Sequence, residues 1–328
     1  MTEPALLHHR TVPTASGDLH LVEQGTGPLV LLLHGFPETW RAWRAQLPAL
    51  AAAGFRAVAL DLRGNGTSSA PADVAAYRLE ALVEDVVTVV HALGESTAVV
   101  VGHDVGSPVA AGAALLRPDV VRAVGLLGVP YTPPGGPRPS EVFAHIGGPD
   151  AEFYVSWFQE PGRAEADIEH DPRAWLTGFT TGLSGESHAS PGPDGLFFVP
   201  RGARMSDRFP DDPAPAWLDP ADLDAAAAEL THTGATGALN RYRNADRDWT
   251  DLAGHTGAHL TQPAVFIGGE LDATSTWLAD VIATQAETVP GLRSSTLLPG
   301  CGHWVQRERP EEVNRLLTEW LADLPTPA

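Results

Sequence analysis

The sequence predicts an α/β fold, a doubly wound and mostly parallel sheet with helices on both faces and a helical segment inserted into it. Apolar runs such as Pro28–Leu33 are unbroken, which is typical of strands buried on both faces. Strand and helix patterns alternate in both end portions of the chain. Between Pro130 and Asp251, proline, glycine, tryptophan and acidic residues replace this pattern. That stretch predicts an inserted cap of helices and loops.

The strands are expected as short apolar or β-branched runs bounded by turn residues, and Ala15-Ser16-Gly17 predicts a hairpin between the first two. The predicted strands are His8–Pro13, Asp18–Glu23, Pro28–Leu33, Phe55–Leu60, Thr97–His103, Val121–Leu127, Pro263–Gly268 and Arg293–Leu298. The length of 328 residues suits one large core with an inserted unit. We therefore predict a core formed by residues 1–129 and 252–328 and a cap formed by residues 130–251.

Helices are predicted where apolar residues recur at helical spacing. One face begins at Leu79 and ends before Gly94, which occupies a C-terminal cap position. Another helix follows the Thr97 strand as far as Leu116, and Pro310 begins the last one. Within the cap, Ser190–Pro220 is rich in proline and predicts a long excursion with little regular structure.

Composition excludes several classes of function. The chain has 21 basic residues, all arginine, against 41 acidic ones, which gives a formal charge of -20. This balance argues against nucleic acid or an anionic membrane as a partner. The absence of lysine excludes Schiff-base and Walker-type chemistry. Cys301 is the one cysteine, expected to be buried, so no internal disulfide can form and a cytoplasmic location is expected. No signal peptide or membrane span is predicted.

The stretch Gly102-His103-Asp104-Val105-Gly106 has the spacing of a nucleophile elbow. In such an elbow, small residues on both sides let a strained backbone hold the nucleophile between a strand and a helix. Asp104 would lie at a helix N-terminus, where the helix dipole favours the charged carboxylate. The alternative is a buried aspartate that caps the helix. We expect His103 to pack or hydrogen-bond locally rather than react.

An ester formed on Asp104 would need a base to activate water. His303 follows the last predicted strand, and the chain order nucleophile, acid, histidine places the base last. Asp272 follows the strand before it and would orient the His303 ring. Glu270 is the rival acid; Asp272 is preferred because it lies farther past the strand end.

The His34-Gly35-Phe36-Pro37 turn follows a buried strand and would complete an oxyanion hole. The backbone N–H groups of Phe36 and Val105 would donate to the oxyanion, each worth about 3 kcal/mol of the barrier. Trp40 and Trp304 adjoin these motifs, so both are expected near the substrate pocket together with the Phe36 and Val105 side chains.

Six motifs together resemble the soluble epoxide hydrolases of the α/β-hydrolase fold, nearly from end to end of the chain. They are HGFPETW (34–40), GHDVGSPVA (102–110), FYVSWFQEPG (153–162), LNRYRN (239–244), GELD (269–272) and GCGHW (300–304). The resemblance implies a mostly parallel eight-stranded sheet with a helical cap and a cis Phe36–Pro37 peptide. It also implies that Tyr154 and Tyr242 hold the epoxide oxygen, since a tyrosine with a pKa near 10 is a proton donor at pH 7.

The implied reaction converts an epoxide to a vicinal diol through a covalent ester on Asp104 that water, activated by His303, hydrolyses. It needs no metal or organic cofactor, and the protein would act as a monomer or a homodimer. Two positions depart from the family pattern, where tryptophan often follows the nucleophile and an aromatic residue often precedes the second tyrosine. Val105 and Arg241 stand there, so a roomier pocket floor is expected.

Two other functions compete with this reading. A haloalkane or haloacid dehalogenase shares the same triad, but haloalkane dehalogenases use the indole that Val105 replaces to bind halide. A ligand-binding α/β-hydrolase without catalysis would lack a triad member, and all expected members are present. A serine esterase is disfavoured because Ser107 lies three residues past the elbow tip.

Overall fold

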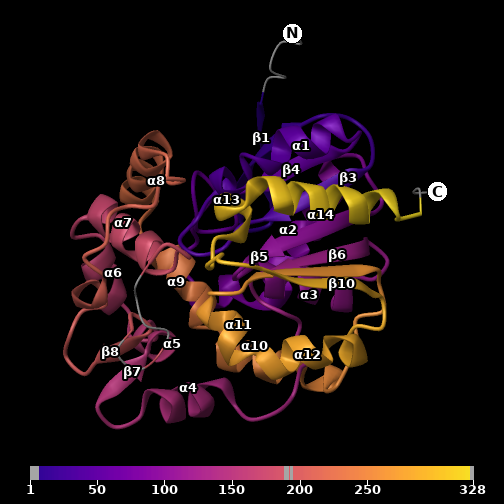
Figure 1. Cartoon of the computed structure of the whole chain (residues 1–328). Coiled ribbons are helices and arrows are strands. Elements are labelled where there is room, and N and C mark those ends of the chain that lie inside the picture. Colours follow the sequence, from indigo (N-terminus) through magenta and orange to yellow (C-terminus); the bar gives the residue numbers. More distant parts are fainter. Residues whose placement is uncertain (1–6, 188–191, 193–194, 326–328) are drawn as a thin grey trace.

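The computed structural model describes residues 7–187, 192 and 195–325 of the chain. Its sheet consists of β1 (His8–Thr14), β2 (Gly17–Gln24), β3 (Leu29–Leu33), β4 (Arg56–Leu60), β5 (Ala98–His103), β6 (Val121–Leu127), β9 (Ala264–Gly269) and β10 (Leu292–Leu298). The eight strands lie in the order β1-β2-β4-β3-β5-β6-β9-β10 (Figure 1). Each coincides with a strand predicted from the sequence, so the predicted α/β fold is confirmed.

Strand pairing is antiparallel between β1 and β2 and between β2 and β4, and parallel across the rest of the sheet. In β3, Leu29, Leu31 and Leu33 face one hydrophobic core, whereas Val30 and Leu32 face the other. Successive side chains of a strand point to opposite faces. Because both faces are covered, every residue of β3 is apolar and buried.

Helices cover the two faces. α2 (Leu79–Ala92), α3 (Gly106–Leu116) and α12 (Ala279–Thr288) pack on one face, and α1 (Gln46–Ala52), α13 (Val305–Glu308) and α14 (Pro310–Ala322) on the other. The core also contains α11 (Ala273–Trp277) and the 3-10 helices η1 (Trp40–Trp43), η2 (Val74–Tyr77) and η4 (Leu252–His255). Parallel strands need such crossover elements, and these helices provide them.

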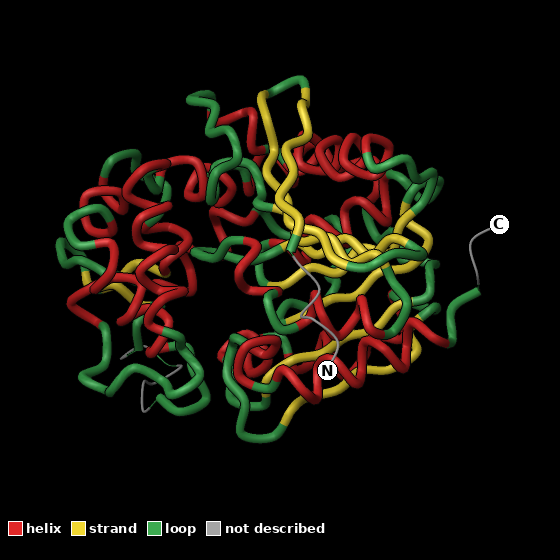
Figure 2. The backbone as a smooth tube through the Cα atoms, turned by 90° about the horizontal axis from the view of Figure 1, so that it is seen from above, coloured by secondary structure: helices red, strands yellow, loops and turns green. Residues whose placement is uncertain are grey.

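The cap is the stretch between β6 and β9 that Figures 1 and 2 show as a mostly helical group beside the sheet. Its elements are α4 (Pro139–Gly147), β7 (Ala151–Phe153), α5 (Tyr154–Trp157), α6 (Arg163–Ile168), α7 (Pro172–Gly182), β8 (Phe198–Pro200), η3 (Ser206–Arg208), α8 (Pro220–Thr233), α9 (Thr236–Tyr242) and α10 (Ala245–Asp251). A third hydrophobic core joins cap residues to Phe36, Ala273 and Trp304 of the main core. The region between cap and sheet is therefore enclosed by apolar packing.

The cap differs from expectation in one respect. β7 and β8 form a small antiparallel sheet that was not predicted, because three-residue strands are too short to show an alternating pattern. Within the predicted excursion 190–220, residues 190, 191, 193 and 194 lie outside the described residues, and the remainder contains only β8, η3 and the start of α8. The cap boundaries at 130 and 251 stay predictions. Among the described helices, none has the length and apolar character needed to cross a membrane.

Candidate active site

Asp104 lies on a sharp turn between β5 and α3. Its φ is 49°, and it is the one residue other than glycine with positive φ in the described part of the chain. A Cβ on Gly102 would lie 2.0 Å from the Gly106 carbonyl oxygen, and one on Gly106 would lie 2.4 Å from the Leu33 carbonyl oxygen. Both flanking glycines are therefore required sterically, and the turn has the strained geometry expected of an elbow.

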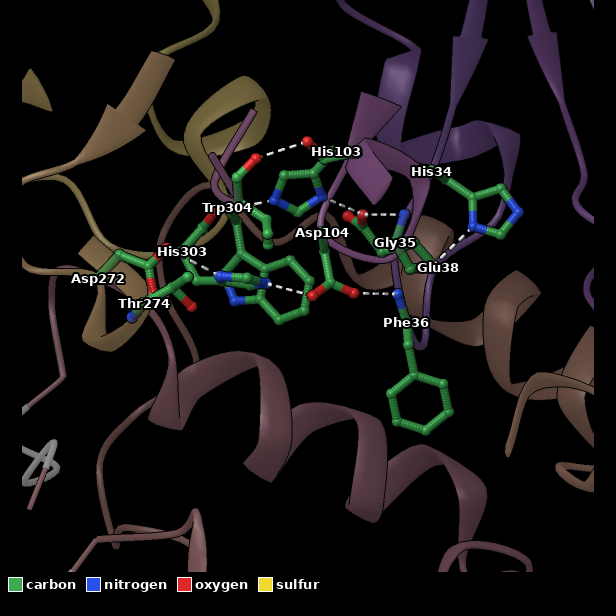
Figure 3. A network of polar contacts seen from close by, with 12 residues as sticks. His34, Gly35, Phe36, Glu38, His103, Asp104, Asp272, Thr274, His303 and Trp304 are labelled. Carbon is green, nitrogen blue, oxygen red and sulfur yellow. Dashed lines mark hydrogen bonds and ion pairs between the residues drawn. The ribbon is translucent and has the colours of Figure 1, made fainter. Parts of the chain in front are cut away.

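The two oxygens of the Asp104 carboxylate have different neighbours (Figure 3). Oδ1 accepts a hydrogen bond of 2.7 Å from the Phe36 N–H, and Oδ2 lies 3.6 Å from Nε2 of His303. Burial raises the pKa of the Asp104 carboxyl, but His303, His103 and the Phe36 N–H outweigh it and hold the pKa below its usual range. The carboxylate is therefore charged at neutral pH.

His303 is held between two carboxylates. Its Nδ1 lies 3.1 Å from Oδ2 of Asp272, whose Oδ1 accepts from the Thr274 N–H at the start of α11. Burial disfavours the imidazolium, yet Asp272 and Asp104 raise the pKa of His303 well above its usual value. Glu270 is exposed and accepts from the Gly300 N–H instead. Asp272 is thus the acid that meets His303.

A second histidine, His103, packs against the ring of His303. Its Nδ1 lies 2.8 Å from Glu38 Oε2 and its Nε2 lies 2.9 Å from the backbone oxygen of His303. His103 therefore links the Glu38 carboxylate to the backbone of His303. Burial raises the pKa of Glu38, but His103 more than offsets this and the pKa is lowered. His103 thus packs and hydrogen-bonds, as expected, although its partners lie 65 and 200 positions away in the sequence.

The two cap tyrosines face the same region from α5 and α9. The rings of Tyr154 and Tyr242 are 6.0 Å apart, and Tyr242 also packs edge-on against Phe36 at 5.5 Å. Within the described residues neither hydroxyl has a hydrogen-bond partner. Burial, reinforced by the Asp104 charge, raises the pKa of both phenols, so both are protonated at neutral pH.

The other predicted site residues are Phe36, Val105, Trp304 and Trp40, and they differ in how closely they lie to the triad and the tyrosines. The Phe36–Pro37 peptide is cis. In the described part of the chain, the Val105 N–H has no acceptor. Val105, Phe36 and Arg241 line a small pocket to which Asp104, His303 and the two tyrosines do not contribute, so the roomier pocket floor stays a prediction. Trp304 is fully buried, with its ring 4.9 Å from that of His303.

Trp40 is not part of this group, which corrects the prediction for it. Its side chain belongs to the core beneath the sheet with Trp43, and its ring packs edge-on against His9. The 3-10 helix η1 begins at Trp40, and the side chains of Trp40, Ala42 and Trp43 are all buried. Adjacency to a motif in sequence thus did not predict adjacency in space.

Comparisons with known proteins agree with this geometry. A family model described as alpha/beta hydrolase fold matches residues 28–310. Epoxide hydrolase B of Mycobacterium tuberculosis is 40% identical, with 96% of this chain and 98% of the relative covered. The chain belongs to the α/β-hydrolase-fold epoxide hydrolases. A solved epoxide hydrolase from an endophytic Streptomyces superposes with a TM-score of 0.93 at 62% identity, covering 96% of this chain and 95% of that one. Epoxide Hydrolase A from Mycobacterium thermoresistibile superposes with a TM-score of 0.91 at 40% identity, covering 98% and 100%.

Family membership makes the protein an enzyme that hydrolyses an ether bond, and it disfavours the dehalogenase and ligand-binding alternatives. Sequence reasoning missed the link from Glu38 through His103 to the base loop of the enzyme. Glu38 did stand inside the HGFPETW motif, but no local pattern could show that its carboxylate meets a histidine on another strand.

Proposed function

We propose that the enzyme converts an epoxide to a vicinal diol in two steps, with Asp104 as the nucleophile and His303 as the base. The observation that carries this proposal is that the two oxygens of the Asp104 carboxylate have different partners. Oδ1 is bound by the backbone N–H of Phe36, while Oδ2 faces Nε2 of His303, and the charge of Asp104 helps to raise the phenol pKa of both tyrosines. Asp272 orients the base.

In the first step Oδ2 of Asp104 attacks a ring carbon and the C–O bond of the epoxide breaks. The oxygen that leaves becomes an alkoxide and takes a proton from Tyr154 or Tyr242. The carboxylate loses its charge as the ester forms. His303 then loses the neighbour that helped to raise its pKa and releases a proton to solvent, and the tyrosinate regains from solvent the proton that it gave up.

In the second step neutral His303 takes a proton from water, and the hydroxide adds to Cγ of Asp104. The N–H groups of Phe36 and Val105 stabilise the resulting oxyanion. The ester C–O bond breaks, the second proton of the water goes to the leaving oxygen, and the diol departs. Asp104 becomes a carboxylate again and keeps the oxygen of the water.

Isotope labelling tests this proposal. In a single turnover of styrene oxide in ¹⁸O-water, the label is expected in the peptide that contains Asp104 and not in the diol. The variant His303→Gln should form the ester and retain it, as an adduct with the mass of the substrate. Label in the diol at the first turnover would instead mean that water attacks the epoxide directly.

We also propose a cytoplasmic location, which the single buried cysteine supports in part, and a monomeric or homodimeric state. Cell fractionation and light scattering test the two expectations separately.

A further inference from the structure

Glu308 at the end of α13 is a buried carboxylate that the mechanism above does not use. Its side chain accepts three backbone hydrogen bonds. Oε2 accepts from Gly302 and Gly185 at 2.9 Å each, and Oε1 accepts from Trp304 at 3.1 Å. In the described part of the chain it makes no ion pair. All its hydrogen bonds are thus to backbone N–H groups, and hydrogen bonds to a charged acceptor are the stronger kind.

Two of these donors flank the base. Gly302 and Trp304 are the residues before and after His303, so the carboxylate fixes the backbone on both sides of the imidazole. The backbone of His303 is itself bonded, since its N–H donates to the Leu183 carbonyl of the cap at 2.9 Å. The base loop is therefore held from α13 and from the cap at once.

The third donor, Gly185, belongs to the cap. A Cβ on Gly185 would lie 2.7 Å from both the Gly300 oxygen and the Gly302 nitrogen, and one on Gly302 would lie 2.2 Å from the Gly185 nitrogen. The two chain segments thus pack backbone against backbone. This close approach brings Gly185 within reach of the carboxylate that also binds Gly302.

We propose that Glu308 is a positioning residue that joins the cap to the base loop, so that docking of the cap at Gly185 and placement of His303 for ester hydrolysis are one event. The inference rests on the proposed two-step function. It assigns the effect to the second step, because Glu308 binds the residues on both sides of the base, whereas in the described part of the chain it makes no hydrogen bond or ion pair with Asp104 or the tyrosines. The cap segment at Leu183–Gly185 then contributes to hydrolysis without touching substrate.

The test is step-resolved kinetics of Glu308→Gln with styrene oxide, using rapid quench and mass spectrometry of the ester. The carboxamide presents an N–H₂ where an oxygen now accepts, so one backbone donor loses its partner. Ester hydrolysis is expected to slow by about ten-fold to a hundred-fold, since small misplacement of a reacting group has costs of that order. The rate of ester formation should stay within about three-fold, and the ester should accumulate. Glu308→Asp, which keeps the charge, should recover part of the loss.

Gly185→Ala tests the same link from the cap side and should also slow hydrolysis selectively. Exposed Glu311→Gln and Gly254→Ala, where a Cβ meets nothing within 4 Å, are the matched controls and should behave as wild type. Unchanged hydrolysis in Glu308→Gln would overturn the inference. An equal fall of both steps together with the melting temperature would also overturn it, because that result indicates a purely structural role. If wild type itself forms no ester, the proposed function fails instead.

Discussion

The two tyrosines are the residues whose roles differ most clearly from those of the triad. Both phenols are protonated and the Asp104 charge helps to raise their pKa, so under the proposed mechanism they serve the first step as proton donors. Replacing both by phenylalanine should reduce the rate of ester formation by about 10²–10⁴-fold, the usual contribution of a general acid. Each single variant should lose less, because the remaining hydroxyl still donates.

Stopped-flow measurement of ester formation checks this prediction, and the hydrolysis rate of any ester formed serves as its internal control. Normal ester formation in the Tyr154→Phe/Tyr242→Phe double variant would remove both residues from the site.

The pH dependence of the two steps should separate. The lowered pKa of Asp104 keeps the nucleophile charged in mildly acidic solution, so ester formation persists there. Hydrolysis needs neutral His303, and Asp272 continues to raise the pKa of that imidazole in the ester. As pH falls, His303 becomes protonated, hydrolysis slows first and the ester accumulates.

Asp272→Asn removes one cause of the raised His303 pKa. The acid limb of the hydrolysis profile should therefore move to lower pH, even though the maximal rate falls because the ring is less well oriented. Single-turnover rates between pH 5 and pH 9 measure both effects. A shift of the limb to higher pH would contradict the assigned direction.

At the scale of elements, buried hydrogen bonds fix α9 and α10 to the core. Asp248 on α10 accepts from the Leu79 N–H at the start of α2 and from Arg241 on α9, both at 2.7 Å. Asn244 is fully buried and donates to the Val74 carbonyl. Because Tyr242 follows Arg241 directly, this anchor sets the position of one proton donor.

Asp248→Asn keeps an acceptor for Leu79 but loses the charge opposite Arg241. We expect it to lower the free energy of unfolding by about 1.5–3 kcal/mol, the range for a hydrogen bond to a charged group. Ester formation should slow more than hydrolysis. Urea unfolding and single-turnover kinetics measure the two effects, with the exposed Asp211→Asn as control. Equal slowing of both steps would argue against a specific link to Tyr242.

Elements differ in how far sequence could predict them. β3 was predictable because its burial on both faces leaves an unbroken apolar run, and the elbow because its glycines are sterically required. The contacts of Glu38 and Glu308 were not, since Glu308 meets Gly185 across 123 positions and no local pattern encodes such a pairing. The prediction for Trp40 failed for a related reason, because being next to a motif in sequence does not determine where a side chain packs.

At the scale of the whole molecule, repulsion among the carboxylates opposes the attraction within the ion pairs. The chain carries a formal charge of -20, while Arg41 and Arg44 beside the HGFP loop pair with Asp222 and Glu229 of α8 in the cap. Partly exposed pairs of this kind contribute little, typically under about 1 kcal/mol each. Repulsion among the many carboxylates should therefore dominate the response to salt.

Raising NaCl from 20 mM to 500 mM should accordingly increase the melting temperature, by roughly 2 °C for each kcal/mol of repulsion that is screened. Differential scanning fluorimetry across a salt series measures this. A melting temperature that falls with salt would show that the ion pairs between cap and core outweigh the net charge.

The burial of Cys301 has a consequence for durability. Epoxides alkylate thiols and amines, and the attacking form of cysteine is the thiolate. Cys301 stands two positions before the base, but its side chain is fully buried and burial raises the pKa of the thiol. The chain contains no lysine at all. The enzyme thus offers its reactive substrate neither an accessible thiol nor a lysine amine, and this protects it against self-inactivation during turnover.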